Sequence, residues 1–248
     1  MRRETLAICG SWLLAAAGFA ASASAQSLDE IVAQHVQALG GIERLRAIQS
    51  LRMSGRVTAG GGREALVVRE ILRPDKIRTE FTLQGVTGVY AFDGERGWKV
   101  APFEGSYAPE PMEEEEASQA ADQADIEGPL VDWKAKGHRV ALVGKETLEG
   151  RDVYKLEVTL EGGSMMQQYL DATTFLRVRT ESTRLVRGHR VELETTFDDY
   201  RSVQGVFFPH SIETGAVGRP RRLTIRVEEI EVNPPLDESG FRMPTPVP

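Results

Sequence analysis

The sequence predicts a mainly β protein in which a few helices accompany a curved antiparallel sheet. Two observations support this fold class. Segments of strand length repeat along the chain with apolar residues at every second position, and helical patterns occur only near the start and in the middle. In residues 153–160, for example, the apolar residues alternate with Lys155, Glu157 and Thr159. Because alternate side chains of a strand point to opposite faces, each strand should bury one face and expose the other.

The N-terminal segment predicts export. Arg2 and Arg3 precede an apolar stretch, residues 6–21, and the small residues 23–25 follow it. This arrangement is typical of a cleavable signal peptide, here residues 1–25 with cleavage before Gln26. The alternative, a membrane anchor, would need ~20 apolar residues and a different downstream flank.

Composition narrows the classes of function. The formal net charge is -7, with 37 acidic and 30 basic residues, which argues against nucleic acid as a partner. Cys9 is the only cysteine and lies within the predicted signal peptide. We therefore expect a mature chain without a disulfide, a thiolate metal ligand or a cysteine nucleophile.

Elements follow in order along the first half. Apolar spacing of three and four residues predicts a helix over residues 28–39 and, after Gly40 and Gly41, a short helix over residues 42–48. Strands are expected at residues 51–59, 65–72, 76–83, 86–92 and 98–101. The composition then changes, and residues 110–136 should contain one or two helices around Gly128 and Pro129.

The second half returns to strands, from His138 to Val232, and ends in an irregular proline-rich tail after Asn233. The alternation slips at Glu228 and Glu229, which predicts a β-bulge that bends the last strand. A single interruption of the strands favours one domain over two.

The pattern alone leaves the covering of the apolar face open. Two sheets could pack together around a dry core, or one sheet could curl around a cavity partly covered by helices. The filled sandwich or barrel is the commoner solution and is the interpretation that periodicity by itself favours.

Four short motifs bear on this choice: Arg73-Pro74 at a strand end, the turn Asp93-Gly94, Trp98 and Pro102. Their order resembles the LolA/LolB-like superfamily of outer-membrane lipoprotein-sorting proteins, which includes the periplasmic lipoprotein carrier. Residues 169–171, residues 207–209, Phe241 and Pro244 also resemble this superfamily.

The resemblance implies a mainly β fold with a helical lid (α+β), in which a single curved antiparallel sheet of about eleven strands forms an unclosed β-barrel. Residues 26–248 would be one LolA-like lipid- or lipoprotein-binding domain in the periplasm. Its apolar cavity would bind acyl chains of lipoproteins or lipids for transport towards the outer membrane. Partners would be inner- and outer-membrane transport components, and the protein would act as a monomer without a cofactor or a metal.

Site residues follow from the same resemblance. In this superfamily the arginine of the arginine-proline pair hydrogen-bonds the lid backbone and keeps the empty cavity closed, which gives Arg73 that role; the alternative is an exposed arginine at a strand end. The lid would come from residues 28–39 and 129–133. The candidate lipid-binding residues, each of which could equally be ordinary core, are Ile77, Phe81, Leu83, Tyr90, Phe92, Trp98, Leu130, Trp133, Leu156, Val158, Leu176, Val178, Val191 and Leu193.

One segment departs from the carrier pattern. Residues 113–116 are four consecutive glutamates followed by alanines and glutamines, a segment foreign to a short lid. Such a run favours a solvated helix face over a metal site, because oxygen-ligand sites need carboxylates that converge from a shaped loop.

Two other functions remain as alternatives. An enzyme is disfavoured because no nucleophile elbow, zinc-binding helix or phosphate-binding loop occurs. The only acid and histidine grouping is Asp198-Asp199 near His210, which a turn explains more simply. The other alternative is a cell-envelope module with a filled barrel that binds protein.

Overall fold

The computed structural model describes residues 26–60, 62–186, 189–220 and 222–245. The predicted signal peptide, residues 1–25, lies outside the described residues. In the described part of the chain, no helix is long and apolar enough to cross a membrane.

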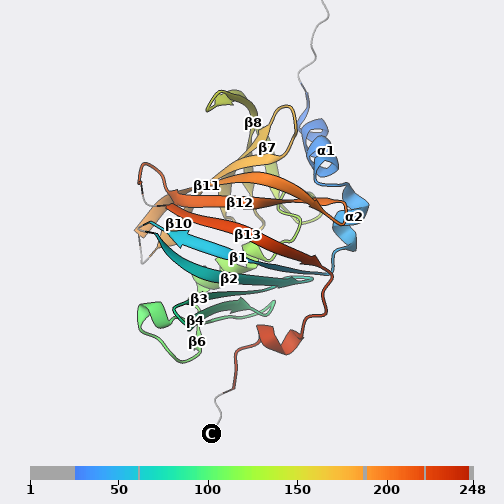
Figure 1. The fold of residues 1–248 in the computed structure, drawn as a ribbon. Helices are drawn as coiled ribbons and strands as arrows, with labels where there is room; N and C mark the ends of the chain where they lie inside the picture. The colour runs from blue at the N-terminus through green and yellow to red at the C-terminus, as the bar shows by residue number, and fades with distance from the viewer. Residues whose placement is uncertain (1–25, 61, 187–188, 221, 246–248) are drawn as a thin grey trace, which may run out of the picture.

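Thirteen antiparallel strands of the described residues form one sheet (Figure 1). The strands are β1 (Ser50–Ala59), β2 (Arg63–Leu72), β3 (Lys76–Leu83), β4 (Val86–Phe92), β5 (Gly97–Val100), β6 (Glu110–Pro111), β7 (Arg139–Leu148), β8 (Arg151–Thr159), β9 (Met165–Asp171), β10 (Arg177–Val186), β11 (His189–Val203), β12 (Val206–Ala216) and β13 (Arg222–Val232). Their order is β6-β5-β4-β3-β2-β1-β13-β12-β11-β10-β9-β8-β7, so β6 and β7 are free edges and the sheet is not closed. The predicted fold class is confirmed, with thirteen strands instead of about eleven.

The join between β1 and β13 brings the two halves of the chain into one sheet. Ser54 pairs with Glu229 whereas Gly55 pairs with Val227, so Glu228 is an extra residue on β13 and the predicted bulge is confirmed. A Cβ atom on Gly55 would lie only 2.0 Å from the carbonyl oxygen of Arg226. Glycine therefore allows the two backbones to approach at the bulge.

In the described ranges, three α-helices accompany the sheet: α1 (Leu28–Ala38), α2 (Ile42–Ala47) and α3 (Glu114–Gln123). Helix α1 starts with a capping box, in which the Ser27 side chain accepts from the Glu30 backbone and the Glu30 carboxylate accepts from the Ser27 backbone. Helices α1 and α2 lie at one end of the sheet (Figure 1) and agree with the expected helices. Around Gly128 and Pro129 the chain forms turns, so only the first part of residues 110–136 is helical.

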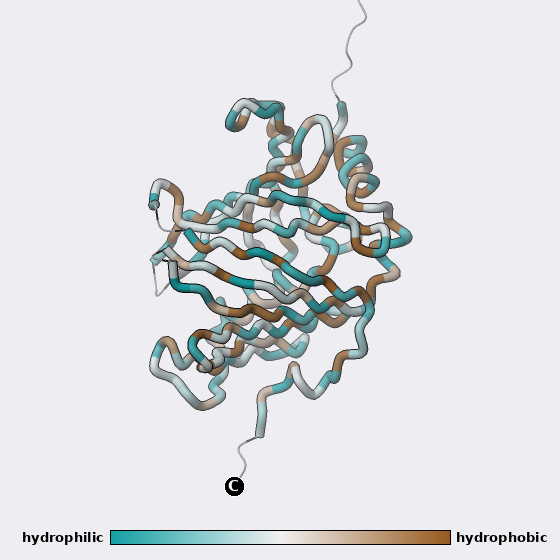
Figure 2. The backbone as a smooth tube through the Cα atoms, viewed as in Figure 1, coloured by the Kyte–Doolittle hydropathy of each residue, from teal (hydrophilic) through white to brown (hydrophobic). Residues whose placement is uncertain are grey.

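Hydrophobic and hydrophilic residues alternate along the strands, as Figure 2 shows. One buried cluster lies where α2 meets β1 to β4 and β12 to β13, and a second lies where α1 meets β8 and β9. Two 3-10 helices complete the described structure, η1 (Pro102–Glu104) and η2 (Glu238–Phe241). The tail after Asn233 is thus less irregular than expected, since η2 packs on β3 and fully buries Phe241.

Candidate functional site

The site begins with the sheet face that the helices cover, called the interior face here. On β3 and β4, Ile77 and Phe92 are paired and pack against Leu45 and Ile48 of the α2 region. The strands beside the β7 edge of the sheet repeat this arrangement. There, Leu156 and Val158 of β8 pack against Ile31 of α1 and Leu130, with Trp133 at the margin of the cluster.

Five other candidates lie further along the interior face. Paired residues of neighbouring strands lie on the same face, so the pairings trace the interior face from β4 through β1 and β13 to β11. It includes Phe81, Leu83, Tyr90, Val191 and Leu193, all of which keep part of their surface exposed.

Two apolar residues near the strand ends are more exposed still. Val86, which pairs with Leu83, is 42% exposed and Leu223 is 43% exposed. A filled barrel would bury inward-facing apolar residues nearly completely. The interior face is therefore closed by α1 and α2 at one end and incompletely covered at the other.

Helix α3 crosses the interior face between these ends. Its residues Ala117, Ala120 and Ala121 pack against the cluster under α2. The Lys99 ammonium of β5 contacts both carboxylate oxygens of Glu116, at 2.9 and 2.7 Å. The acidic run is thus solvated only in part: residues 113–115 are exposed, but the helix that follows packs inside the sheet.

The C-terminal part of α3 reaches the opposite wall. The Oδ2 atom of Asp122 lies 3.6 Å from Nη1 of Arg184 on β10. Burial raises the pKa of Asp122, and the charge of Arg184 opposes that shift. Helix α3 therefore spans the concave side from β5 to β10 and occupies room that an acyl chain would also use.

Arg73 joins three parts of the fold at the end of β2. Its Nε donates to the carbonyl oxygen of Ile48 at 2.5 Å, and its Nη2 donates to that of Leu45 at 3.2 Å. The same Nη2 donates at 2.8 Å to Glu127, whose side chain is only 4% exposed. The carbonyls at the end of a helix have no partner within the helix, so a guanidinium suits this position. Arg73 thus ties β2 to α2 and to the segment after α3.

The structure corrects three of the candidate residues. Trp98 pairs with Ala91, whereas Phe92 pairs with Gly97, so Trp98 lies on the sheet face opposite to Phe92. There its Nε1 donates to the carbonyl oxygen of Phe241 at 2.7 Å. Placing Trp98 on the interior face was wrong, because the phase of β5 depends on its pairing with β4 and cannot be read from so short a strand.

Leu176 and Val178 are the other two corrections. The pairing of β9 with β10 shifts by one residue between Arg177 and Arg179, so Arg177 pairs with the fully buried Leu170. The Arg177 guanidinium lies 4.0 Å from the Phe197 ring centroid. Arg177 therefore takes the interior place that simple alternation assigns to Val178. Leu176 and Val178 instead line a hollow of about 470 Å³ together with Arg151, Asp171, Thr173, Thr174, Phe197, Asp198, Asp199 and Tyr200.

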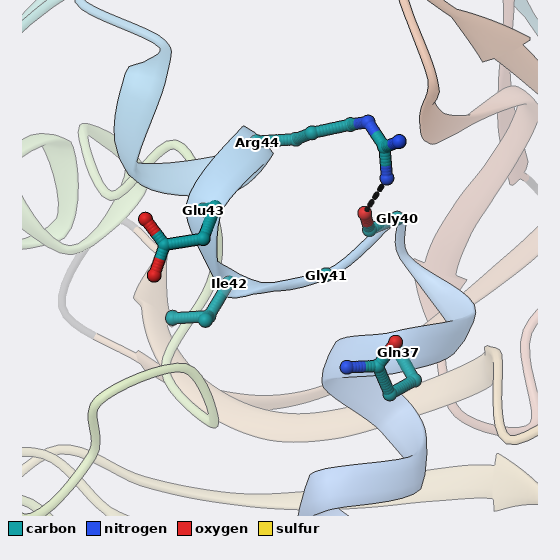
Figure 3. A pocket seen from close by; sticks show the side chains of 6 residues that line it. All are labelled: Gln37, Gly40, Gly41, Ile42, Glu43 and Arg44. Carbon is teal, nitrogen blue, oxygen red and sulfur yellow. Dashed lines mark hydrogen bonds between the residues drawn. The ribbon is translucent and has the colours of Figure 1, made fainter.

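A second hollow, of about 400 Å³, lies at the corner between α1 and α2 (Figure 3). Arg44 reaches back there to donate from Nη1 to the Gly40 carbonyl at 2.8 Å. A Cβ atom on Gly40 would lie 2.2 Å from the Gly205 carbonyl oxygen, so this corner fits closely against the turn between β11 and β12. The remaining lining residues are Gln37, Gly41, Ile42 and Glu43. Ile42 is the only large apolar side chain among these residues, so the hollow offers little surface to an acyl chain.

The acid and histidine grouping shows no catalytic arrangement. The carboxylate of Asp199 accepts from Arg201 at 2.9 and 2.6 Å, which lowers the pKa of Asp199. The Nδ1 atom of His210 is 3.0 Å from the Phe208 carbonyl oxygen. In the described chain, no group of three or more histidine, cysteine, aspartate or glutamate residues could hold a metal ion.

His35 on α1 provides a test of how tightly the lid is packed. Burial lowers its pKa to about 4, the hydrogen bond between Nδ1 and the Phe175 carbonyl at 2.7 Å opposes this shift, and the Arg177 charge adds to it. In the unfolded chain the pKa of His35 is ~6.5. As the pH falls, His35 therefore binds its proton in the unfolded chain at a higher pH than in the folded protein.

Stability is thus expected to be fully present above pH ~6.5 and to be lost as the pH falls towards 4. Between pH 6 and 4.5, the free energy of unfolding of the wild type should fall by about 1 kcal/mol per pH unit more than that of His35→Gln. Urea unfolding at several pH values measures this difference. Parallel profiles for the two proteins would show that His35 is not buried.

Sequence reasoning missed Glu127 and Arg69. No sequence signal identifies Glu127, because its role depends on Arg73, 54 residues away. Arg69 could have been noticed in the sequence, because it stands between Val67 and Ile71 at a position where the alternation of β2 places apolar residues. An arginine in the buried phase of a strand indicates either an ion pair or a binding site.

Comparison with known proteins adds evidence on the fold. No family model matches the sequence, and no curated protein matches it. A domain described as an outer membrane lipoprotein-sorting protein, from Vibrio parahaemolyticus, superposes with a TM-score of 0.57 at 15% identity, over 86% of this chain and 94% of that chain.

Two further solved structures are similar to the chain. A LolA superfamily protein from Nitrosomonas europaea gives a TM-score of 0.55 at 13% identity, over 85% of this chain and 96% of that one. A DUF1329 family protein from Desulfovibrio piger gives 0.56 at 12% identity, over 86% and 96%. With its single unclosed antiparallel sheet and its helices over one face, the chain has a LolA-like fold.

Proposed function

We propose that this protein is a periplasmic carrier that binds acyl chains of lipoproteins or lipids on its interior face for transport towards the outer membrane. The observation that carries the proposal is the partial exposure of apolar residues such as Phe81 and Leu193, although they face the concave side. The LolA-like fold supports it. Each methylene that leaves water there would contribute about 0.8 kcal/mol to binding.

Arg73 is the proposed lock of the empty state. Its bonds to Leu45, Ile48 and Glu127 hold α2 and the segment after α3 together, next to the cluster that contains Ile77 and Phe92. A lipid that reaches under the helices has to separate these groups, and acyl burial offsets the lost bonds. Such a monomeric carrier needs no cofactor, because cargo passes between membrane transport components according to their relative affinities.

A matched pair of variants tests the binding face. Leu193→Gln changes the interior face, whereas Leu66→Gln changes an exposed leucine of β2 on the other face. We expect Leu193→Gln to weaken binding of the fluorescent probe N-phenyl-1-naphthylamine by about tenfold, and Leu66→Gln to leave it unchanged, because one buried leucine contributes ~1.5 kcal/mol or more. A fluorescence titration measures both affinities. A wild type that binds no probe, or equal effects of the two substitutions, would contradict the proposed site.

Helix α3 favours a second function. Because it fills part of the concave side, the protein could instead be a cell-envelope module with a filled barrel that binds another protein. Native mass spectrometry of protein purified from an envelope separates the two functions. Copurified acyl lipid supports the carrier, and lipid-free protein with a bound polypeptide supports the module. Neither function includes catalysis, which the separate bonding of Asp199 and His210 also disfavours.

A further inference from the structure

Arg69 is an enclosed cation on the interior face of β2. Its Nε donates to Oγ1 of Thr79 at 3.2 Å, and its Nη2 donates to Oε1 of Gln123 on α3 at 3.3 Å. Both acceptors are neutral, and no ion pair of the described residues includes Arg69. The only acidic residue outside the described ranges is Glu4, in the predicted signal peptide. Among the described residues, Arg69 is therefore a cation without a counter-charge.

The other arginines differ from Arg69. Eleven described arginines form ion pairs with carboxylates: Arg46, Arg52, Arg56, Arg73, Arg78, Arg96, Arg151, Arg179, Arg184, Arg201 and Arg222. Those without such a pair are exposed, except Arg69 and Arg177. Arg177 lies over the Phe197 ring, which offers a partial negative charge. Acidic residues outnumber basic ones by 37 to 30, so carboxylates are not scarce in this chain.

The surroundings of Arg69 fit an anion. Burial lowers its pKa, and a buried charge is costly unless an opposite charge accompanies it. Arg69 nevertheless keeps some accessible surface. Cross-strand pairing places Arg69 opposite Thr79, and Thr79 opposite Tyr90, so a guanidinium and two hydroxyls lie in one row across three strands. Phe81 is the next interior residue of β3, on the side of the incompletely covered end.

We propose that Arg69 binds the anionic head of an amphiphile, a carboxylate or a phosphate, whose acyl chain lies along Phe81 and Leu83. This inference rests on the proposed function and narrows its ligand to a lipid with a charged head. A guanidinium binds either group through two parallel hydrogen bonds. Thr79 and Tyr90 would add hydroxyl donors from the adjoining strands.

Another role for Arg69 has to be distinguished. It lies beside Gln123, the last residue of α3, where the helix end carries partial negative charge. A purely structural arginine would stabilise α3 in the ligand-free protein. Thermal unfolding of ligand-free Arg69→Met, a variant that keeps an unbranched side chain but removes the charge, separates the roles. An unchanged or higher midpoint supports the anion site, and a midpoint lowered by several degrees overturns it.

Binding provides the direct test. Palmitate and its uncharged methyl ester are titrated against the wild type, Arg69→Gln and the control Arg226→Gln, which removes an exposed arginine of β13. Arg69→Gln should weaken palmitate binding by about 10- to 100-fold, the range of a hydrogen bond to a charged group, and leave the methyl ester unchanged. Arg226→Gln should change neither.

Three other results would overturn the inference. If both amphiphiles bind and Arg69→Gln affects neither, the inference fails while the proposed function stands. If neither amphiphile binds the wild type, the inference and the proposed function both fail. If acetate or inorganic phosphate binds as tightly as palmitate and depends on Arg69, the ligand is a small free anion and not a lipid head.

Discussion

Phe241→Ala is expected to lower the free energy of unfolding by about 3–5 kcal/mol, the usual cost of removing a fully buried aromatic ring. Phe241 ends η2, and its carbonyl oxygen accepts the Nε1 hydrogen of Trp98 at 2.7 Å. The substitution therefore leaves a cavity beside β3 and weakens the packing of η2 over Trp98. Urea unfolding followed by tryptophan fluorescence measures the change.

Met243→Ala is the matched control, because Met243 lies two residues further on and is 45% exposed. It should change the free energy of unfolding by no more than about 0.5 kcal/mol. Equal effects of the two substitutions would mean that the tail does not pack on the sheet. The expected difference makes the C-terminal segment part of the fold and not a linker.

Arg73→Leu is expected to lower the free energy of unfolding by about 3 kcal/mol, because it leaves the buried Glu127 carboxylate without its close partner. Lys136 remains 3.9 Å from that carboxylate and limits the loss. The substitution also frees the carbonyls of Leu45 and Ile48. Amide hydrogen exchange in α2 should therefore become faster, which is the behaviour expected of a released lid.

Arg46→Leu is the control for this prediction. Arg46 also joins α2 to the segment after α3, through two hydrogen bonds to Asp132 at 3.0 and 2.9 Å, but this pair is largely exposed. Its loss should cost no more than about 1 kcal/mol. The double variant Arg73→Leu with Glu127→Gln should recover part of the stability. If it is no more stable than Arg73→Leu alone, the buried carboxylate is not the cause.

Local features of the fold were predictable because neighbouring residues encode them. The capping box at Ser27, the helical spacing of α1 and the two-residue period of most strands depend on residues close in sequence. The bulge was predictable for the same reason, since Glu228 interrupts the alternation of its own strand. On β3 and β8 the apolar phase also identified the interior residues, among them Ile77 and Leu156.

The errors concern short or irregular strands. Trp98 was assigned to the wrong face because β5 has only four residues, and its pairing with β4 decides the phase. Val178 was assigned wrongly because the register shift beside it depends on β9. In both cases a distant strand determines which way the side chain points.

The one-sided strands and the helices at the start and in the middle of the chain could be predicted without the structure, because these patterns are local. Contacts between distant segments place α3 across the concave side, bring Arg73 to Glu127 and enclose Arg69 with no carboxylate partner among the described residues. Such features cannot be read from local patterns, because burial and ion pairing depend on which distant segments meet. Periodicity shows which face of a strand is apolar, but contacts between segments decide how completely that face is covered.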